Sequence, residues 1–88
     1  MIETTVKIIN NAGLHTRPAA TIVKLASKFK SDFFLNKDGM HINGKSIIGV
    51  MTLAAEKGSE IVLSFDGPDE AEAAEEILNY FNRGFDEM

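Results

Sequence analysis

The chain has 88 residues, of which 44% are hydrophobic and 25% charged, and it contains no cysteine. This length and composition fit one soluble folded domain spanning residues 1–88 and exclude an intrinsically disordered chain. The lack of cysteine excludes disulfide scaffolds, thiolate metal clusters and thiol nucleophiles. Residues 1–5 do not resemble a signal peptide, and no apolar run reaches the roughly 18 residues that span a bilayer. We therefore expect a cytoplasmic protein without membrane insertion.

The formal net charge of -4 is unevenly divided along the chain. Residues 1–65 contain eight Lys and Arg against five Asp and Glu, whereas residues 66–88 contain one Arg against eight acidic residues. A domain that binds nucleic acid usually has a clustered basic surface and a pI above about 9. The pI of 5.0 argues against nucleic acid as a partner. The mildly basic first part suits an acidic protein partner, and the acidic last part indicates a solvated helix face.

The spacing of apolar residues predicts seven elements in chain order. Alternation with a period of two predicts strands, and spacings of three and four residues predict helices. The elements are a strand at 2–9, a helix at 16–28, strands at 32–36 and 40–43, a short helix at 47–51, a strand at 59–65 and a helix at 70–83. The order βαββαβα predicts an α+β open-faced sandwich, in which a four-stranded, mainly antiparallel sheet carries three helices on one face.

Turn and capping residues separate these elements. The pair Asp38-Gly39 is typical of a tight β-hairpin turn. Ser46 and Asp69 are placed to cap the second and third helices, and Asp69 with Glu72 resembles a capping box. Gly84 is placed to end the last helix in a left-handed conformation.

The segment Gly13–Pro18 places His15 between a glycine loop and a helix N-terminus, two residues before Arg17. The first backbone N–H groups of a helix lack internal partners and carry the positive end of the helix dipole, so an anion is stabilised there. A phosphoryl group on the imidazole would be such an anion, and the Arg17 guanidinium would donate charge-assisted hydrogen bonds to it. The residues alone leave a second interpretation open, in which His15 is only an exposed helix cap.

Other residue types give little support to a self-contained enzyme. His41 is expected on the strand at 40–43 with no acid or second metal ligand beside it, and Phe34 is expected to point from the open sheet face to solvent. The chain has no Ser-His-Asp order, no pair of metal ligands at helical spacing and no glycine-rich nucleotide loop. We therefore expect neither a metal nor a cofactor.

The runs GLHTRPAA at residues 13–20 and NGKSIIGVMTLAAEKGSEI at residues 43–61 resemble the HPr family of the phosphoenolpyruvate-dependent sugar phosphotransferase system. The resemblance covers essentially the whole chain. It implies that enzyme I phosphorylates His15 on Nδ1, that Arg17 assists, and that the group passes to the IIA domains of sugar permeases. It further implies that Ser46 is phosphorylated by an HPr kinase/phosphorylase, and that a transcriptional regulator is an additional partner.

The sequence departs from this family at Ala12, where many relatives carry a polar side chain near the active histidine. Any orientation of the imidazole from that position is therefore absent here. The presence of His15 also matters, because a relative with Gln at this position could regulate but could not carry phosphate.

The second helix has more apolar residues than so short a helix can bury, which indicates a docking surface. The expected partner-binding residues are Thr16, Lys24, Ile47, Ile48 and Met51. If this helix lies beside His15, the surface would be ringed by Arg17, Lys24, Lys28 and Lys45, which suits transient binding of acidic proteins to a monomer.

Two other functions remain open at this point. A regulatory module would use the same surface and Ser46 without phosphoryl transfer, and a nitrogen-related phosphorelay would use His15 with different acceptors.

Overall fold

The structure is a computed structural model that describes residues 1–87. Its elements are β1 (Ile2–Lys7), α1 (Thr16–Ala26), β2 (Asp32–Lys37), β3 (Met40–Asn43), α2 (Ile47–Thr52), β4 (Glu60–Asp66), α3 (Glu70–Asn82) and the 3-10 helix η1 (Gly84–Asp86). The predicted βαββαβα order is confirmed. The structure adds η1, which the sequence pattern did not predict.

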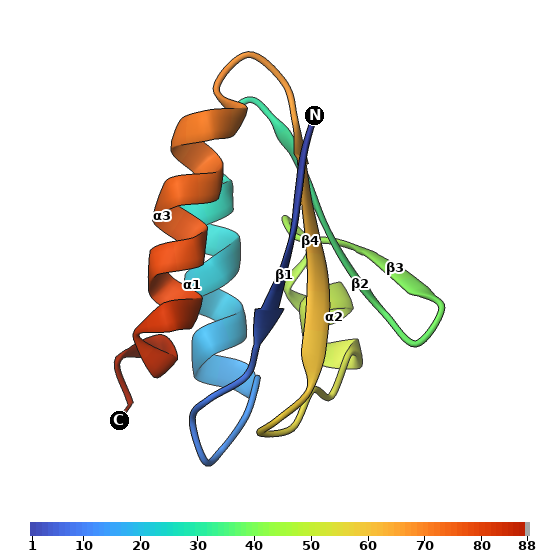
Figure 1. Cartoon of the computed structure of the whole chain (residues 1–88), viewed down its shortest axis with the longest axis vertical. Coiled ribbons are helices and arrows are strands. Elements are labelled where there is room, and N and C mark those ends of the chain that lie inside the picture. The colour runs from blue at the N-terminus through green and yellow to red at the C-terminus, as the bar shows by residue number, and fades with distance from the viewer. Residues whose placement is uncertain (88) are drawn as a thin grey trace.

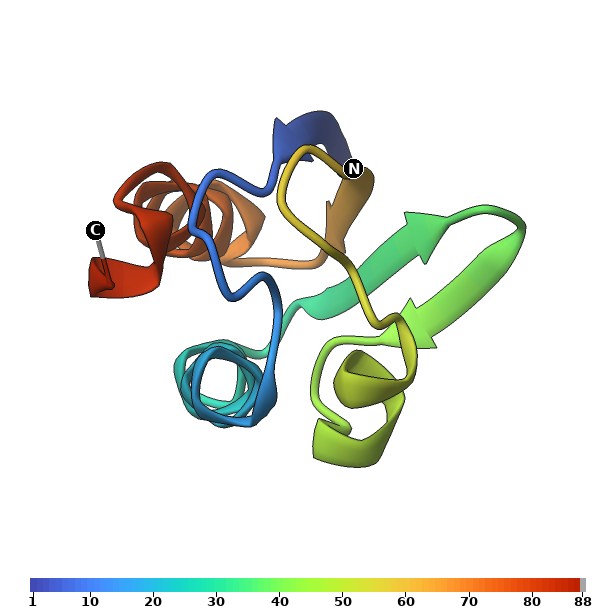
Figure 2. The ribbon, with the colours of Figure 1, turned by 90° about the horizontal axis from the view of Figure 1, so that it is seen from below.

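The four strands form one antiparallel sheet in the order β1-β4-β2-β3. Strand β4 therefore lies inside the sheet and pairs with both β1 and β2. Figure 1 shows α1 and α3 side by side along the sheet. Figure 2, seen from below, shows α2 on the same side of the sheet, next to α1. The predicted open-faced sandwich with three helices on one face is confirmed.

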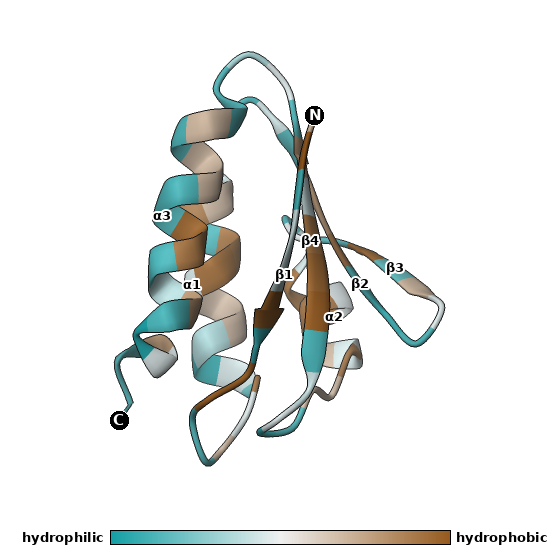
Figure 3. Cartoon of the chain, in the orientation of Figure 1, coloured by the Kyte–Doolittle hydropathy of each residue, from teal (hydrophilic) through white to brown (hydrophobic). Residues whose placement is uncertain are grey.

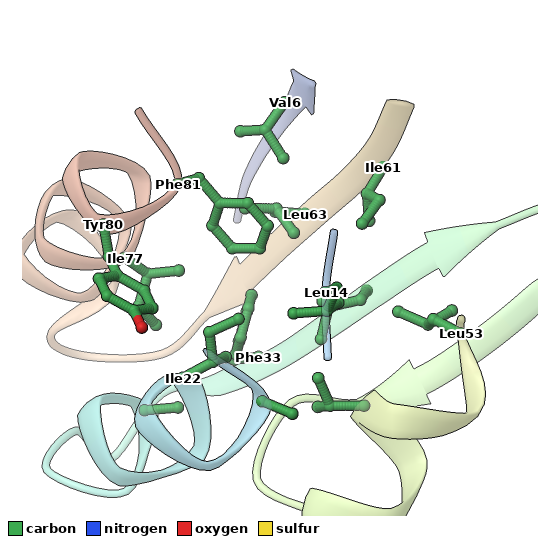
Figure 4. Packing of buried hydrophobic residues seen from close by; sticks show 14 of the residues in the cluster. Val6, Leu14, Ile22, Phe33, Leu53, Ile61, Leu63, Ile77, Tyr80 and Phe81 are labelled. Atoms are coloured by element: carbon green, nitrogen blue, oxygen red, sulfur yellow. The ribbon is translucent and has the colours of Figure 1, made fainter. Parts of the chain in front are cut away.

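The hydrophobic core lies between the sheet and the helices. Strand β4 alternates as predicted, so that Ile61, Leu63 and Phe65 are fully buried, and α3 contributes Ile77 and Phe81. Figure 4 shows the side chains of Leu63, Ile77 and Phe81 converging on one cluster. Figure 3 shows the matching hydropathy pattern, with hydrophobic residues along the middle of β4 and hydrophilic bands on α3. Burial of each large side chain stabilises the fold by roughly 1.5–3 kcal/mol.

The predicted capping box at the start of α3 is wrong. The side chain of Asp69 makes no hydrogen bond to its own helix, and Glu70, rather than Glu72, bonds back to the turn before the helix. The Asp69 carboxylate instead accepts hydrogen bonds from the Ser31 hydroxyl at 2.5 Å and from the backbone N–H groups of Ser31 and Lys30, each at 2.9 Å. The Ser31 hydroxyl first, and then the Lys30 N–H, lower the pKa of Asp69 to about 2. The Asp69 carboxylate thus accepts three hydrogen bonds here, whereas in a capping box it would accept one, from the N–H of Glu72.

The other local predictions agree with the structure more closely. Ser46 Oγ accepts a hydrogen bond from the Gly49 N–H at 3.2 Å, which confirms the predicted cap of α2. Gly84 has a φ of 62°, which confirms the left-handed conformation after α3. Helix α1 ends at Ala26, short of the predicted end near Lys28, because the Lys28 N–H bonds three residues back to Leu25 instead of four.

The open face of the sheet carries the second histidine. His41 is exposed, stacks on the Phe34 ring with centroids 4.3 Å apart, and bonds through Nδ1 to the Asn36 side chain. Phe34 lies on the sheet face opposite its buried neighbour Phe33, as predicted, although the contact with His41 leaves it only half exposed.

Candidate functional site at the start of α1

The loop that leads into α1 is held by the segment after α2. The Leu14 N–H donates to the Ala55 carbonyl at 2.9 Å, and the Leu14 side chain is buried. Gly13 has a φ of 73°, and a Cβ at this position would lie 2.5 Å from the Ala55 oxygen. Only glycine satisfies both the left-handed backbone and this close approach. The neighbouring His15 is therefore set in place by backbone contacts from a distant part of the chain.

A buried asparagine fixes the same loop from inside. Asn10 is 1% exposed, and its Nδ2 donates to the Gly13 carbonyl at 2.9 Å and to Glu87 Oε1 at 2.8 Å. Its Oδ1 is buried and has no hydrogen-bond partner within residues 1–87. Asn10 thus joins the loop before α1 to the segment after α3, although 77 residues separate the two partners.

His15 is the N-cap residue of α1, but its side chain makes no capping hydrogen bond. The ring is about half exposed, and Nε2 lies 2.7 Å from Glu87 Oε2. An ionised carboxylate only accepts hydrogen bonds, so Nε2 carries the proton that it donates to Glu87. Among residues 1–87, no group is hydrogen-bonded to Nδ1. The interpretation of this ring as a helix cap is wrong, and Nδ1 is the ring nitrogen with an available lone pair.

The start of α1 can accommodate an anion. The first bond of the helix joins the Ala19 N–H to the His15 carbonyl, so the N–H groups of Thr16 and Arg17 precede the intrahelical ladder. Pro18 has no N–H, and the first turn contains no acidic residue. The positive end of the helix dipole is therefore not compensated by its own side chains. The Arg17 side chain is exposed and forms no ion pair within the part of the chain that the structure describes.

Helix α2 packs against α1 and exposes three apolar side chains, Ile47 at 40%, Ile48 at 77% and Met51 at 41%. We name these three residues the apolar patch. Val50 and Leu53 of the same segment are buried. The prediction that part of this group is exposed is thus confirmed, and the patch lies on the helix next to the one that carries His15 (Figure 2).

The expected basic ring around the patch is only partly present. Lys28 pairs with Glu76 of α3, and Lys45 donates from Nζ to the Phe29 carbonyl at 2.8 Å. These two lysines are therefore engaged elsewhere, one by the Glu76 carboxylate and the other by the Phe29 carbonyl, which lies three residues after the end of α1. Arg17 and Lys24 remain exposed and have no salt-bridge partner among residues 1–87.

Sequence reasoning missed two members of this site, Asn10 and Glu87. No local pattern marks a contact between residues that lie 72 positions apart, as His15 and Glu87 do. Within residues 1–87, the structure shows no cluster of metal-binding side chains, and no helix in that range is long and apolar enough to cross a membrane.

An open-faced βαββαβα sandwich with an available histidine at the start of its first helix is the arrangement of a small histidine phosphocarrier. The family model described as "PTS HPr component phosphorylation site" matches residues 2–83. The chain therefore belongs to the HPr family, the phosphocarriers of the sugar phosphotransferase system.

Individual relatives agree with this assignment. The chain is 47% identical to the phosphocarrier protein HPr of Treponema pallidum over 99% of both chains. It is 42% identical to an HPr crystal structure from Thermoanaerobacter tengcongensis, with a TM-score of 0.95 over 100% of this chain and 99% of the other. A crystal structure of the Bacillus subtilis catabolite repression protein Crh, a dimer with a swapped domain, is 43% identical with a TM-score of 0.76, covering 96% and 97% of the two chains.

Proposed function

We propose that this chain accepts a phosphoryl group from enzyme I on Nδ1 of His15 and donates it to the IIA domains of sugar permeases. The observation that carries the proposal is the placement of His15 at the start of α1, with Nε2 engaged by Glu87 and Nδ1 available. Membership of the HPr family supports it. The protein is then a carrier with a covalent phosphohistidine intermediate and not an enzyme with a substrate of its own.

The transfer step uses groups that meet at the start of α1. The Nδ1 lone pair forms a bond to phosphorus while the bond from phosphorus to the donor breaks, and the electron pair of that bond leaves with the donor. The backbone N–H groups of Thr16 and Arg17 precede the intrahelical ladder and would donate to the phosphoryl oxygens. The Arg17 guanidinium adds charge-assisted hydrogen bonds, each of about 1.5–3 kcal/mol. Neither a metal nor a cofactor takes part in this proposal.

Partners dock beside the histidine in this proposal. The apolar patch (Ile47, Ile48 and Met51) supplies the apolar contact, and Thr16, Arg17 and Lys24 supply a polar and basic margin. An apolar centre with a charged margin is typical of transient interfaces, and the positive sign suits acidic partners. The carrier acts as a single domain of residues 1–88, as a monomer in the cytoplasm. Because the relative Crh forms a dimer, sedimentation analysis of the purified protein is the test of that state.

A second function, regulation through Ser46, is favoured by the geometry of α2. Ser46 is exposed, caps the helix and directly precedes Ile47 and Ile48 of the apolar patch. Phosphorylation of this hydroxyl by an HPr kinase/phosphorylase would place about -1.5 to -2 charges at the edge of the docking surface. Such a charge would weaken docking of enzyme I and create a new surface for a transcriptional regulator.

The test is incubation of the purified protein with enzyme I and labelled phosphoenolpyruvate, followed by acid treatment of the product. Phosphohistidine is acid-labile and phosphoserine is not, so transfer to His15 predicts a label that acid removes. His15→Ala should take up no label, and His41→Ala, which removes the other histidine from the open sheet face, should be labelled normally. An unlabelled wild-type protein, or a labelled His15→Ala variant, would exclude the proposed transfer.

A further inference from the structure

Glu87 connects His15 to the interior of the protein. One carboxylate oxygen, Oε2, accepts from His15 Nε2 at 2.7 Å, and the other, Oε1, accepts from Asn10 Nδ2 at 2.8 Å. The Glu87 side chain is 16% exposed, and Asn10 also donates to the Gly13 carbonyl. Ring, carboxylate, buried amide and loop backbone therefore form one continuous set of hydrogen bonds around the start of α1.

The segment after α3 is fixed in a way that holds Glu87 at this place. Phe85 is buried, and its ring packs against Tyr80 and Phe81 with centroids 5.2 and 5.0 Å apart. The Arg83 guanidinium bonds Asp86 Oδ1 at 2.7 Å. Phe85 and Asp86 both have a φ near 60°, a left-handed conformation that is unfavourable for residues with side chains. Such strain persists only when surrounding contacts determine the backbone, and it is frequent at functional sites.

Alternative sources of ring orientation in the loop are absent. Ala12 has no polar side-chain group, and the Asn10 amide donates to Glu87 and Gly13. Within residues 1–87, Glu87 is the side chain that holds the His15 ring.

We infer that Glu87 is a positioning residue for phosphoryl transfer: by holding the His15 Nε2–H it fixes the tautomer and directs Nδ1 toward the phosphoryl donor. This inference rests on the proposed function. When Nδ1 bonds to phosphorus, the proton stays on Nε2 and the ring gains a positive charge. The Glu87 carboxylate, 2.7 Å from Nε2, offsets that charge as it develops. The same contact favours the phosphorylated state, since the charge persists until the group is passed on.

The kinetic test compares Glu87→Ala, Glu87→Gln and Glu75→Ala in steady-state phosphorylation by enzyme I. Glu87→Ala should lower kcat about tenfold with KM changed less than about twofold, because the ring and not the docking surface is altered. Gln can still accept a hydrogen bond from Nε2–H but carries no charge, so Glu87→Gln should restore about half of the decrease in log kcat. Glu75→Ala removes one exposed acid from α3 and should match the wild type. Equal kcat in Glu87→Ala and the wild type would overturn the inference.

A second readout does not depend on phosphorylation. Side-chain ¹⁵N spectra of the unphosphorylated protein, at a pH where the ring is neutral, should show a protonated Nε2 with a slowly exchanging proton in the wild type. That proton signal should be lost in Glu87→Ala and retained in Glu87→Gln. A wild-type spectrum with the proton on Nδ1 would overturn the inference. Failure of the wild type to accept phosphate would instead overturn the proposed function, and the spectra would then show whether Glu87 holds the ring at all.

Discussion

Helices α1 and α2 are neighbours, and the side chains of their N-cap residues, His15 and Ser46, bind different partners. At α2, Ser46 Oγ accepts the Gly49 N–H, so the side chain serves its own helix. At α1, the His15 ring makes no bond to its helix and turns to Glu87, which leaves the N–H groups of Thr16 and Arg17 for an external acceptor. A helix start that is not capped by its own side chain keeps its donors for an anion.

The surroundings of the two residues differ as well. Two residues after His15 lies Arg17, an exposed cation, whereas Ser46 is followed directly by the exposed Ile47 and Ile48. A phosphoryl group at α1 therefore meets both helix donors and a positive side chain. At α2 it meets the helix dipole but lies against a surface that a partner must desolvate. A phosphoryl group is thus expected to be transferred to partners from His15 and to inhibit partner binding when it is on Ser46.

The largest effect is expected from His15→Ala, which should abolish labelling by enzyme I. Among residues 1–87, the half-exposed ring makes one side-chain hydrogen bond, to Glu87, so the free energy of unfolding should fall by only about 0.5–1.5 kcal/mol. Labelling is measured together with urea unfolding of the same preparation. If His15→Ala loses labelling because it is unfolded, His15 would have a structural role at the start of α1, and the proposed difference from Ser46 would be contradicted.

Arg17→Ala should slow transfer by roughly 10- to 100-fold, since it removes charge-assisted stabilisation of about 1.4–3 kcal/mol from the transition state. Arg17→Lys is the matched variant, because it keeps the charge and loses the planar pair of donors. It should lie between Arg17→Ala and the wild type in single-turnover transfer. Wild-type rates in Arg17→Ala with both enzyme I and a IIA domain would show that Arg17 is only a solvated charge.

Ser46→Asp should raise the KM for phosphorylation by enzyme I about fivefold, as expected from about 1 kcal/mol of repulsion and desolvation at the docking surface. Asp caps a helix about as well as Ser, so the thermal midpoint should be unchanged or slightly higher. Ser46→Asn is the control that keeps the cap without the charge and should leave KM unchanged. Normal kinetics in Ser46→Asp and in authentic phosphoserine protein would remove Ser46 from the functional surface.

Local periodicity was enough to predict the order of elements and the Ser46 cap. The alternation over β4 and the helical spacing over α3 are set by which faces are buried, and this information is present in short windows of sequence. The cap of α2 depends on residues only three positions apart, Ser46 and Gly49. His15 and Arg17 were identified by the same kind of local signal, a helix start beside a glycine loop.

The contacts that were missed depend on residues far apart in sequence. Glu87 reaches His15 across 72 positions, and Asp69 reaches Ser31 across 38. Lys28 was expected near the apolar patch but pairs with Glu76, which lies 48 positions away. Several side chains in the sequence could pair with a given exposed acidic or basic residue. Which of them lies close enough is determined by tertiary packing, here that of α1 against α3.

The third helix start gives the smallest expected effect on transfer. Asp69 resembles His15 in that its side chain does not serve its own helix, but its carboxylate binds the Ser31 hydroxyl and the backbone after α1. Its role is to tie two segments together and not to bind an exchangeable group. Asp69→Asn should therefore leave the phosphorylation rate within about twofold of the wild type, while lowering the stability at neutral pH.

The pH dependence of that stability loss shows whether Asp69 stabilises the fold through its ionised carboxylate or through packing alone. The pKa of Asp69 is lowered from 3.8 to about 2 in the folded protein, chiefly by the Ser31 hydroxyl. Because the folded pKa is lowered, the stabilisation is fully present above about pH 5 and is lost as the pH falls through 3.8 toward 2, since the unfolded state takes up the proton first. The stability difference between wild type and Asp69→Asn should therefore be constant from pH 7 to about 5 and shrink between about 4 and 2.

Urea unfolding of both proteins across this pH range measures the stability difference. Asp32→Asn is the control for the loss of one negative charge. A difference that persists unchanged at pH 2 would show that the Asp69 side chain acts through packing and not through its charge.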